Sequence, residues 1–365
     1  MKRVVCALIA VLLLMSAAGA EVSGNLLGLR ALSKLTDGTK NAAVSPVSLA
    51  LALSMAREGA AGATLQELDE LLAGEAIDVE SLTRAGIRSA NAGFVSPDYA
   101  LLEDYMERVD AKWFTMNDDA MAQVNAWVED MTDGLIPRVL DKAPSDLTAA
   151  YLVNALAMDR EWRIPFPKDG GYEDAFFAPS GEKQIDYMYV EDDFFYKEAA
   201  GAQVIQLKYE DSPLAMYVVL PEKGGVPDVL EALSEGGFSY FDDMDDAPEV
   251  QLSLPKFSIS EGGSMLDTLK ALGMELSCSR DDADFSRMCE VPLYIADVIQ
   301  KVRIDADEAG TKAAAATVIE IMPAMAAPPQ LEEEPIVMKV DRPFVAVIAD
   351  ASTGAIAFAA VVAEI

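Results

Sequence analysis

Apolar residues recur with the period of a helix mainly in the first half of the chain and with the period of a strand mainly in the second. A helix is expected over 46–56, because Ser45 is a good N-cap and proline is tolerated at the first helical position. Thr64 and Glu67 have the spacing of a capping box, which predicts the start of a second helix. Further helices are expected over 119–131 and 264–272.

The second half is expected to form strands, because apolar and polar residues alternate there. The expected strands cover 204–209, 214–220, 250–259, 293–305, 344–349 and 355–362. In the fourth of these, Gln300 shares a face with Val302 and Ile304, so its amide must find a hydrogen-bond partner in an apolar layer. No repeat or linker divides the chain, and the sequence therefore predicts a single α+β domain over 21–365.

The most informative segment covers 307–321. Read with a period of two, it places small or apolar residues on one face, namely Thr311, Ala313, Ala315, Thr317, Ile319 and Ile321. Local propensity alone favours an alanine-rich helical turn instead. The segment is followed by 323–335, which holds four prolines and three consecutive glutamates and would not fit within a sheet. A strand joined to such a loop can lie in solvent or be added to a sheet.

The first twenty residues have the pattern of a secretory signal peptide. Lys2 and Arg3 precede an apolar stretch over 4–15, and the small residues Ala18-Gly19-Ala20 come before Glu21. We expect cleavage there and a secreted product, with an uncleaved membrane anchor as the alternative. Cleavage would change the net charge from −33 to −35, because two cations and no acids leave with residues 1–20.

Composition argues against an enzyme. The chain has no histidine, which excludes a Ser-His-Asp or Cys-His catalytic unit and every histidine-based metal site. The strongly negative charge argues against nucleic acid and anionic membranes as partners. Cys278 and Cys289 are the only cysteines after residue 20, and whether they pair is left open. No cofactor and no metal ion is expected.

The sequence from Glu308 to Thr317 resembles the hinge of the inhibitory serpins. Other stretches resemble the same family in the same order along the chain, namely Ser45-Pro46-Val47-Ser48, Asn125-Ala126-Trp127-Val128, Leu152-Val153-Asn154-Ala155, Leu254-Pro255-Lys256-Phe257, Ala283-Asp284-Phe285-Ser286 and Arg342-Pro343-Phe344. The resemblance implies a serpin fold, in which helices pack around a large mixed β-sheet with further sheets. It also implies an exposed reactive-centre loop, here over about 308–339.

What the resemblance implies for function is irreversible inhibition of serine proteases. The protease cleaves the loop, forms an acyl-enzyme and is trapped when the hinge is inserted into the sheet as a new strand. The implied hinge residues are Glu308, Gly310, Thr311, Ala313, Ala315 and Thr317. Ser48, Asn154 and Gln300 correspond to the cluster that controls opening of the sheet, although the family often has histidine where this chain has Gln300.

The same resemblance places a loop–sheet junction at Trp162, Lys256 and Glu308, with an ion pair between Lys256 and Glu308. The expected scissile bond is Ala324–Met325, thirteen places beyond Thr311, and alanine before the bond suits an elastase-like protease. Cleavage at Met325–Ala326 is the alternative and would favour a chymotrypsin-like target. The loop of this chain is longer than in familiar members of the family, and both cleavage positions therefore stay open.

One other function and one other class of target remain as alternatives. A non-inhibitory serpin, acting as a carrier or chaperone, usually has bulky, charged or proline residues in the hinge, and the inward-facing residues here are small. A cysteine protease is a further possible target, because the loop presents a scissile bond to either class. The protein is expected to be a monomer that can form loop–sheet polymers on heating.

Overall fold

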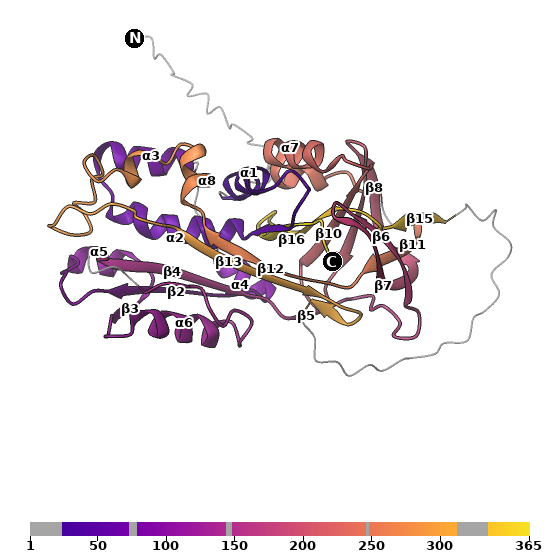
Figure 1. The fold of residues 1–365 in the computed structure, drawn as a ribbon, viewed down its shortest axis with the longest axis horizontal. Helices are drawn as coiled ribbons and strands as arrows, with labels where there is room; N and C mark the ends of the chain where they lie inside the picture. The colour runs from indigo at the N-terminus through magenta and orange to yellow at the C-terminus, as the bar shows by residue number, and fades with distance from the viewer. Residues whose placement is uncertain (1–23, 73–78, 144–147, 246–247, 312–334) are drawn as a thin grey trace, which may run out of the picture.

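The computed structural model describes residues 24–72, 79–143, 148–245, 248–311 and 335–365 (Figure 1). The largest sheet of the described residues has six strands, in the order β1-β17-β16-β10-β9-β8. The strands are β1 (Ala42–Val44), β8 (Phe195–Ala199), β9 (Ala202–Lys208), β10 (Leu214–Pro221), β16 (Phe344–Asp350) and β17 (Ile356–Val362). Every residue of β10, β16 and β17 is buried, so this part of the sheet is covered on both faces.

Alternate side chains of the six-stranded sheet enter two different hydrophobic cores. Ala346 and Ile348 of β16 belong to one core, and Val345 and Val347 to the other. The cause is the period of two of a strand, which sends neighbouring side chains to opposite faces. The continuous apolar sequences of β16 and β17 follow from burial on both faces.

Three smaller sheets complete the β structure. The order β3-β2-β4 uses β2 (Arg88–Val95), β3 (Lys112–Thr115) and β4 (Ala150–Ala157). The order β12-β13-β14-β5 uses β5 (Arg160–Glu161), β12 (Phe257–Ser264), β13 (Ile299–Ala306) and β14 (Gly310–Thr311). The order β15-β11-β7-β6 uses β6 (Tyr172–Ala178), β7 (Gly181–Asp193), β11 (Glu249–Pro255) and β15 (Ile336–Lys339).

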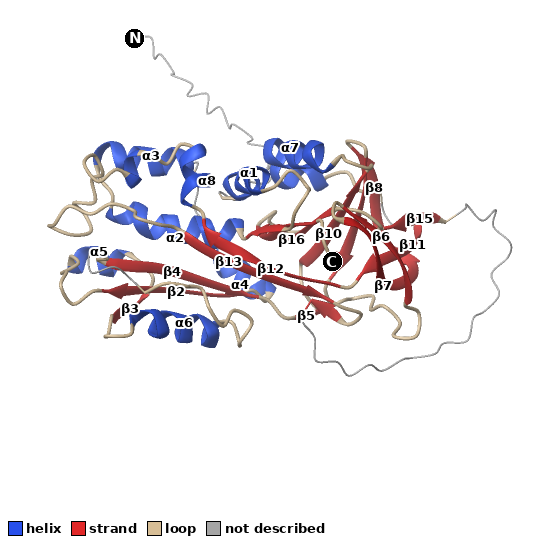
Figure 2. Cartoon of the chain, in the orientation of Figure 1, coloured by secondary structure: helices blue, strands red, loops and turns tan. Residues whose placement is uncertain are grey.

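The helices gather in one half of the molecule, and the other half is mainly strands (Figure 2). The α-helices are α1 (Asn25–Leu35), α2 (Pro46–Gly59), α3 (Gly62–Leu71), α4 (Val79–Ala85), α5 (Glu103–Arg108), α6 (Ala120–Met131), α7 (Val226–Gly236) and α8 (Leu266–Ala271). Two short 3₁₀-helices are η1 (Gly237–Phe241) and η2 (Leu276–Cys278). None of the helices in the described ranges is long and apolar enough to cross a membrane.

The predicted start of α2 is confirmed, since the Ser48 backbone N–H donates to the Ser45 hydroxyl at the helix N-cap. The predicted capping box at Thr64 and Glu67 is wrong. The helix begins two residues before Thr64, whose hydroxyl accepts the Asp284 backbone N–H at 2.9 Å. The Glu67 carboxylate accepts backbone N–H groups of Glu275, Leu276 and Ser277 instead. These contacts span more than two hundred residues, so local spacing could not reveal them.

Most expected strands are present, but several boundaries differ. The pair β9 and β10 forms the expected antiparallel hairpin, and β16 and β17 pair as expected. The region 250–259 is divided at Lys256 between β11 and β12, which lie in different sheets. Strand β13 begins at Ile299, not at 293, and α8 covers less than the expected 264–272.

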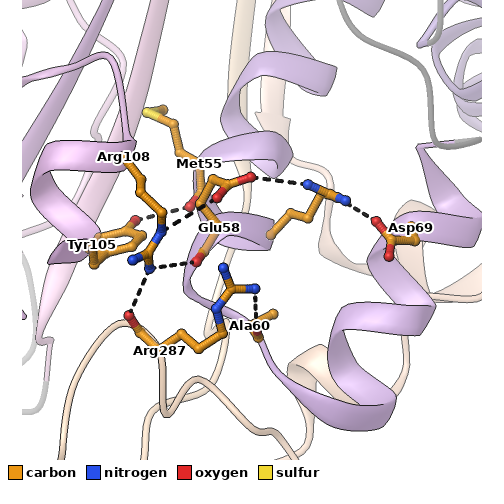
Figure 3. Close-up of polar contacts among 8 residues, drawn as sticks. Met55, Glu58, Ala60, Asp69, Tyr105, Arg108 and Arg287 are labelled. Atoms are coloured by element: carbon orange, nitrogen blue, oxygen red, sulfur yellow. Dashed lines mark hydrogen bonds and ion pairs between the residues drawn. The ribbon is translucent and has the colours of Figure 1, made fainter.

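Charged side chains join the ends of α2, α3 and α5 (Figure 3). Arg57 of α2 contacts the Asp69 carboxylate of α3. Arg108 at the end of α5 lies 3.6 Å from the Glu58 carboxylate and also donates to the Arg287 backbone carbonyl. These arginines are about a third exposed, so the network fixes helix positions more than it adds free energy of folding.

Candidate functional site: the hinge and the gap beside it

The first residues of the expected hinge lie inside a sheet. Strand β14 lies between β13 and β5, with Thr311 opposite both Ala306 and Arg160 and Gly310 opposite Glu161. Gly310 is required for this approach, because a Cβ atom there would lie 2.1 Å from the Arg160 carbonyl oxygen. The sequence from 310 onwards therefore enters the molecule at a defined point between two strands.

Thr311 is held in this position by a buried tyrosine. Its side chain is 5% exposed, and its hydroxyl lies 2.6 Å from the Tyr209 hydroxyl in a hydrogen bond. Burial strongly raises the pKa of Tyr209, although its hydrogen bond with Thr311 partly opposes this, so the phenol stays protonated. The Tyr209 ring stacks on Trp162 with centroids 4.7 Å apart. The Thr311 side chain therefore points into the interior of the protein.

Trp162 and Phe166 hold the turn that precedes β14. The Trp162 backbone N–H donates to the Ala309 carbonyl at 2.8 Å, and its indole N–H donates to the Asp307 carbonyl at 2.9 Å. The Phe166 N–H donates to the Glu308 carbonyl at 3.0 Å. Three consecutive carbonyls of the hinge thus have fixed partners, which determines where the chain enters the sheet.

The ion pair expected at the loop–sheet junction is present. The Lys256 ammonium lies 2.6 Å from the Glu308 carboxylate, and the two side chains are 41% and 22% exposed. Partial burial raises the pKa of Glu308, but hydrogen bonds from Lys256 and the backbone outweigh this, and the pKa is lowered overall. The hydrogen bond with Glu308 raises the pKa of Lys256. At this exposure the pair contributes less than about 1 kcal/mol.

A gap between β4 and β13 continues beyond Thr311. Strand β4 is paired with β2 along its whole length, and β13 is paired with β12 in the same way. Within the described ranges, β13 meets β14 only at Ala306, and no ladder joins β4 to β13. A void of about 10 Å³ borders Thr311 together with Leu156 of β4 and Ile304 of β13. The two strands thus present unpaired backbone edges on either side of a narrow apolar space.

The structure joins two of the three residues of the expected sheet-opening cluster, Ser48 and Gln300, through Ser45. The Gln300 amide accepts the Ser45 backbone N–H at 3.0 Å and donates to the Ser45 carbonyl at 2.9 Å, so it has the partner that its buried position requires. Ser48 also meets Ser45, as the helix cap described above. No hydrogen bond joins the side chains of Ser48, Asn154 and Gln300. The sequence predicts Ser45 only as an N-cap, because its contact with Gln300 joins residues 255 positions apart.

Asn154 belongs to a separate network on β2 and β4. Its amide N–H groups donate to Asn91 Oδ1 at 2.9 Å and to the Ser89 hydroxyl at 3.2 Å. Its Oδ1 atom is buried and has no hydrogen-bond partner within the described part of the chain. A buried acceptor without a partner costs free energy, so this atom marks a place where the present arrangement is incomplete.

Several expected site residues lie outside the described residues, namely Ala313, Ala315, Thr317, Ala324 and Met325, as does the expected signal peptide over 1–20. Both cysteines after residue 20 are free thiols, and the Cys289 thiol donates to the Ala100 carbonyl at 3.3 Å. Over the described ranges, no group of histidine, cysteine or acidic side chains is arranged to hold a metal ion.

Comparison with known proteins identifies what this arrangement resembles. The family model described as serpin (serine protease inhibitor) matches residues 23–365. A serpin-like protein of Thermococcus kodakarensis is 31% identical over 352 residues, which cover 89% of this chain and 81% of that protein. Serpin-Z1B of Triticum aestivum is also 31% identical, over 87% of this chain and 88% of its own.

Solved structures agree with these sequence matches. The thermophilic serpin tengpin in its native state has a TM-score of 0.82 at 26% identity, and the match covers 94% of this chain and 93% of that one. Cleaved Serpin 42Da has a TM-score of 0.79 at 25% identity, and the match covers 94% of this chain and 98% of that one. The predicted arrangement of helices around several sheets is confirmed by these matches.

Proposed function

Because the chain belongs to the serpin (serine protease inhibitor) family and not to a family of enzymes, we propose that it inhibits serine proteases irreversibly by inserting its cleaved loop as a strand. The observation that carries this proposal is β14. Its two residues already lie between β13 and β5, at the open end of a gap flanked by unpaired strand edges. A chain that continues from Thr311 into this gap gains ladder hydrogen bonds on both sides.

The register of β14 specifies which residues would meet. Continued without a shift, it would set Ala313 between Met158 and Ile304, and Ala315 between Leu156 and Val302. Small side chains suit this narrow apolar space, which supports an inhibitory hinge over a carrier or chaperone.

The same register would place Thr317 between Asn154 and Gln300. A hydroxyl there could donate to the unpaired Asn154 Oδ1 atom, so insertion would complete a network that is incomplete now. In this proposal Asn154 and Gln300 recognise the inserted strand from opposite sides, although they make no hydrogen bond with each other.

Trapping is a competition between two rates. The protease attacks the loop and forms an acyl-enzyme, and strand insertion must carry it away before water hydrolyses the acyl bond. The intact state is held by a barrier and not by equilibrium, because the unpaired edges of β4 and β13 would be satisfied by insertion. Slower insertion converts the inhibitor into an ordinary substrate.

The finer assignments are part of the proposal. The target is an elastase-like serine protease that cleaves Ala324–Met325, since alanine suits a shallow apolar specificity pocket. The protein acts outside the cell as a single domain over 21–365 after removal of residues 1–20, and it is monomeric. A chymotrypsin-like target cleaving at Met325–Ala326, or a cysteine protease, is the alternative target.

The test combines a gel with a mass measurement. Incubation with elastase should produce a covalent complex that survives denaturing electrophoresis, and the released peptide should begin at Met325. Ala324→Arg should lose trapping of elastase and gain trapping of trypsin. If elastase, chymotrypsin, trypsin and papain all yield only cleaved product, the chain is not an inhibitor. A released peptide that begins at Ala326 moves the site by one residue.

A further inference from the structure

A cavity lies directly behind the residues that hold the hinge. Its volume is about 180 Å³, and it is lined by the end of β9, by the residues around the start of β8, and by the segment 162–166. We call it the β9-edge cavity, because it occupies the edge of β9 beside Leu207 and Lys208, past the first residue of β8. Trp162 forms part of its wall, and the same residue binds the Asp307 and Ala309 carbonyls.

The cavity is apolar inside and charged at its mouth. Phe166, Phe194 and Leu207 line it and are no more than 5% exposed. Arg163 and Asp193 also line it and are exposed, so they mark the side that is open to solvent. The Lys208 ammonium lies 3.8 Å from the centroid of the Phe195 ring, at the same cavity.

The size of the cavity limits what it can hold. An enclosed apolar cavity of about 150 Å³ in another protein stays dry and binds benzene. At about 180 Å³, the β9-edge cavity has room for one six-membered aromatic ring and a short substituent. A larger ring system would not fit without movement of Trp162 or Phe166.

The charges at the mouth indicate the substituent. Two cations, Arg163 and Lys208, and one carboxylate, Asp193, line the cavity, in a chain with a net charge of −33. The Arg163 guanidinium has no ion-pair partner among the residues that the structure describes. A guanidinium binds a carboxylate through two parallel hydrogen bonds, so a carboxylate is the complementary group.

We propose that the β9-edge cavity binds a small aromatic carboxylate. The ring packs against Phe166, Phe194 and Leu207, and the carboxylate lies at the mouth with Arg163 and Lys208. Because the ring also touches Trp162, an occupied cavity restrains the residue that holds the hinge carbonyls in place. The ligand is thus a regulator of strand insertion. This regulatory role rests on the proposed inhibitory function, whereas the binding itself does not.

The binding test uses the intact protein and three probes. Phenylacetate has the ring and the charge, phenylacetamide has the ring alone, and acetate has the charge alone. Calorimetric titration should show saturable binding of phenylacetate, with phenylacetamide about tenfold weaker or worse, as expected for loss of a charged hydrogen bond. Acetate should not bind measurably. The melting temperature should rise with the logarithm of phenylacetate concentration.

Three variants locate the site. Arg163→Gln should weaken phenylacetate binding about tenfold, because it removes a charged donor from the mouth. Ile164→Trp should abolish binding by filling the cavity while keeping Arg163. Arg280→Gln removes an exposed arginine on the loop after η2 and should leave binding unchanged. Equal affinity for the acid and the amide, or equal binding by wild type and Arg163→Gln, would overturn the proposal. If Ile164→Trp does not fold, the Arg163→Gln result decides.

A second measurement separates this proposal from the inhibitory function. Wild type and Arg163→Gln are incubated with elastase with and without phenylacetate, and the number of inhibitor molecules consumed per trapped protease is determined. A change in wild type that is absent in Arg163→Gln supports regulation, and no change in either overturns it. Arg163-dependent binding by a chain that traps no protease would leave the site intact and refute the inhibitory function. A chain that traps protease but does not bind phenylacetate would refute the binding site and leave the inhibitory function intact.

Discussion

The six-stranded sheet and the pair of strands that flank the hinge differ in how their strand edges are paired. Strand β16 is hydrogen-bonded on both sides, to β10 and to β17, and all seven of its residues are buried. Strand β4 is paired only with β2 within the described ranges, and five of its eight residues are partly exposed. The central strands of the six-stranded sheet therefore have no unpaired edge. Within the described ranges, β4 and β13 each have an unpaired edge, and these two edges face the gap.

The two regions therefore have different roles. The six-stranded sheet contributes stability, and the strands beside the gap serve the proposed strand insertion. In the six-stranded sheet a central strand such as β16 has a hydrogen-bonded neighbour on both sides, so little is gained by rearrangement. Across the gap, the edges of β4 and β13 and the Asn154 acceptor have no partner within the described ranges, and an added strand would remove these costs. Changes in the first region should alter the melting temperature alone, and changes at the gap should alter how often a protease is trapped.

The largest effect is expected from Thr311→Arg. Thr311 is the first side chain in the gap, and no carboxylate of the described residues hydrogen-bonds to it. A guanidinium there would be buried without a partner, at a cost of several kcal/mol, so β14 is expected to leave the sheet. Insertion after cleavage would then have to bury the charge, which slows it by about a hundredfold or more. Elastase should still cleave the loop, but the gel should show product and almost no covalent complex.

The matched control for this change is Thr311→Ser, which keeps the hydroxyl that meets Tyr209. It should trap protease nearly as well as wild type. If Thr311→Arg traps protease with unchanged stoichiometry, strand insertion does not pass through the position of β14. The comparison between the two regions would then fail at its central point.

The opposite behaviour is expected from Ile356→Ala in the six-stranded sheet. Ile356 is fully buried in β17, and removal of its side chain should cost about 2–5 kcal/mol of stability. The melting temperature at a fixed scan rate should fall by several degrees, because the cost is in packing. The stoichiometry of inhibition should stay at the wild-type value. A marked loss of trapping in this variant would show that the two regions are not separable.

How much could be predicted from sequence also differs between the two regions. The six-stranded sheet was largely predictable, because β9, β10, β16 and β17 are each a single local pattern. The gap was predicted only through resemblance to a family. Its pairings, such as Gln300 with Ser45 and Tyr209 with Thr311, join residues 255 and 102 positions apart. No local period carries that information, and the same reason explains the wrong capping box at Thr64 and Glu67.

An intermediate effect is expected from Tyr209→Phe. The change removes the hydroxyl that binds Thr311 but keeps the ring that stacks on Trp162. The Thr311 hydroxyl is left buried without a partner, at a cost of about 1–3 kcal/mol, so β14 leaves the gap more readily and insertion must begin again. More inhibitor should be consumed per trapped protease than in wild type.

The double variant Tyr209→Phe with Thr311→Val sharpens this prediction. Removal of both hydroxyls leaves no unpaired group, and the pair of apolar side chains can be nearly neutral. The double variant should therefore trap protease better than Tyr209→Phe alone. Strictly additive effects would show that the hydrogen bond between the two residues does not hold the hinge.

The smallest effect is expected from Glu308→Gln at the loop–sheet junction, where the variant keeps a hydrogen-bond acceptor for Lys256 but loses the charge. The pair is partly exposed, so its contribution is less than about 1 kcal/mol. The pKa of Glu308 in the folded protein is lowered below its ordinary value of 4.5. A lowered pKa means that the stabilisation is present above that value and is lost as the pH falls through the folded pKa.

The melting temperatures of wild type and Glu308→Gln should therefore differ slightly at pH 7 and converge as the pH falls below about 4.5. Glu235→Gln is the matched control, since Glu235 is exposed and has no partner within the described residues. It should match wild type at both pH values. A difference for Glu308→Gln that persists or grows in acid would mean that Glu308 acts through packing of its side chain and not through its charge. The loop–sheet junction would then resemble the six-stranded sheet, where the packing of apolar side chains determines the melting temperature.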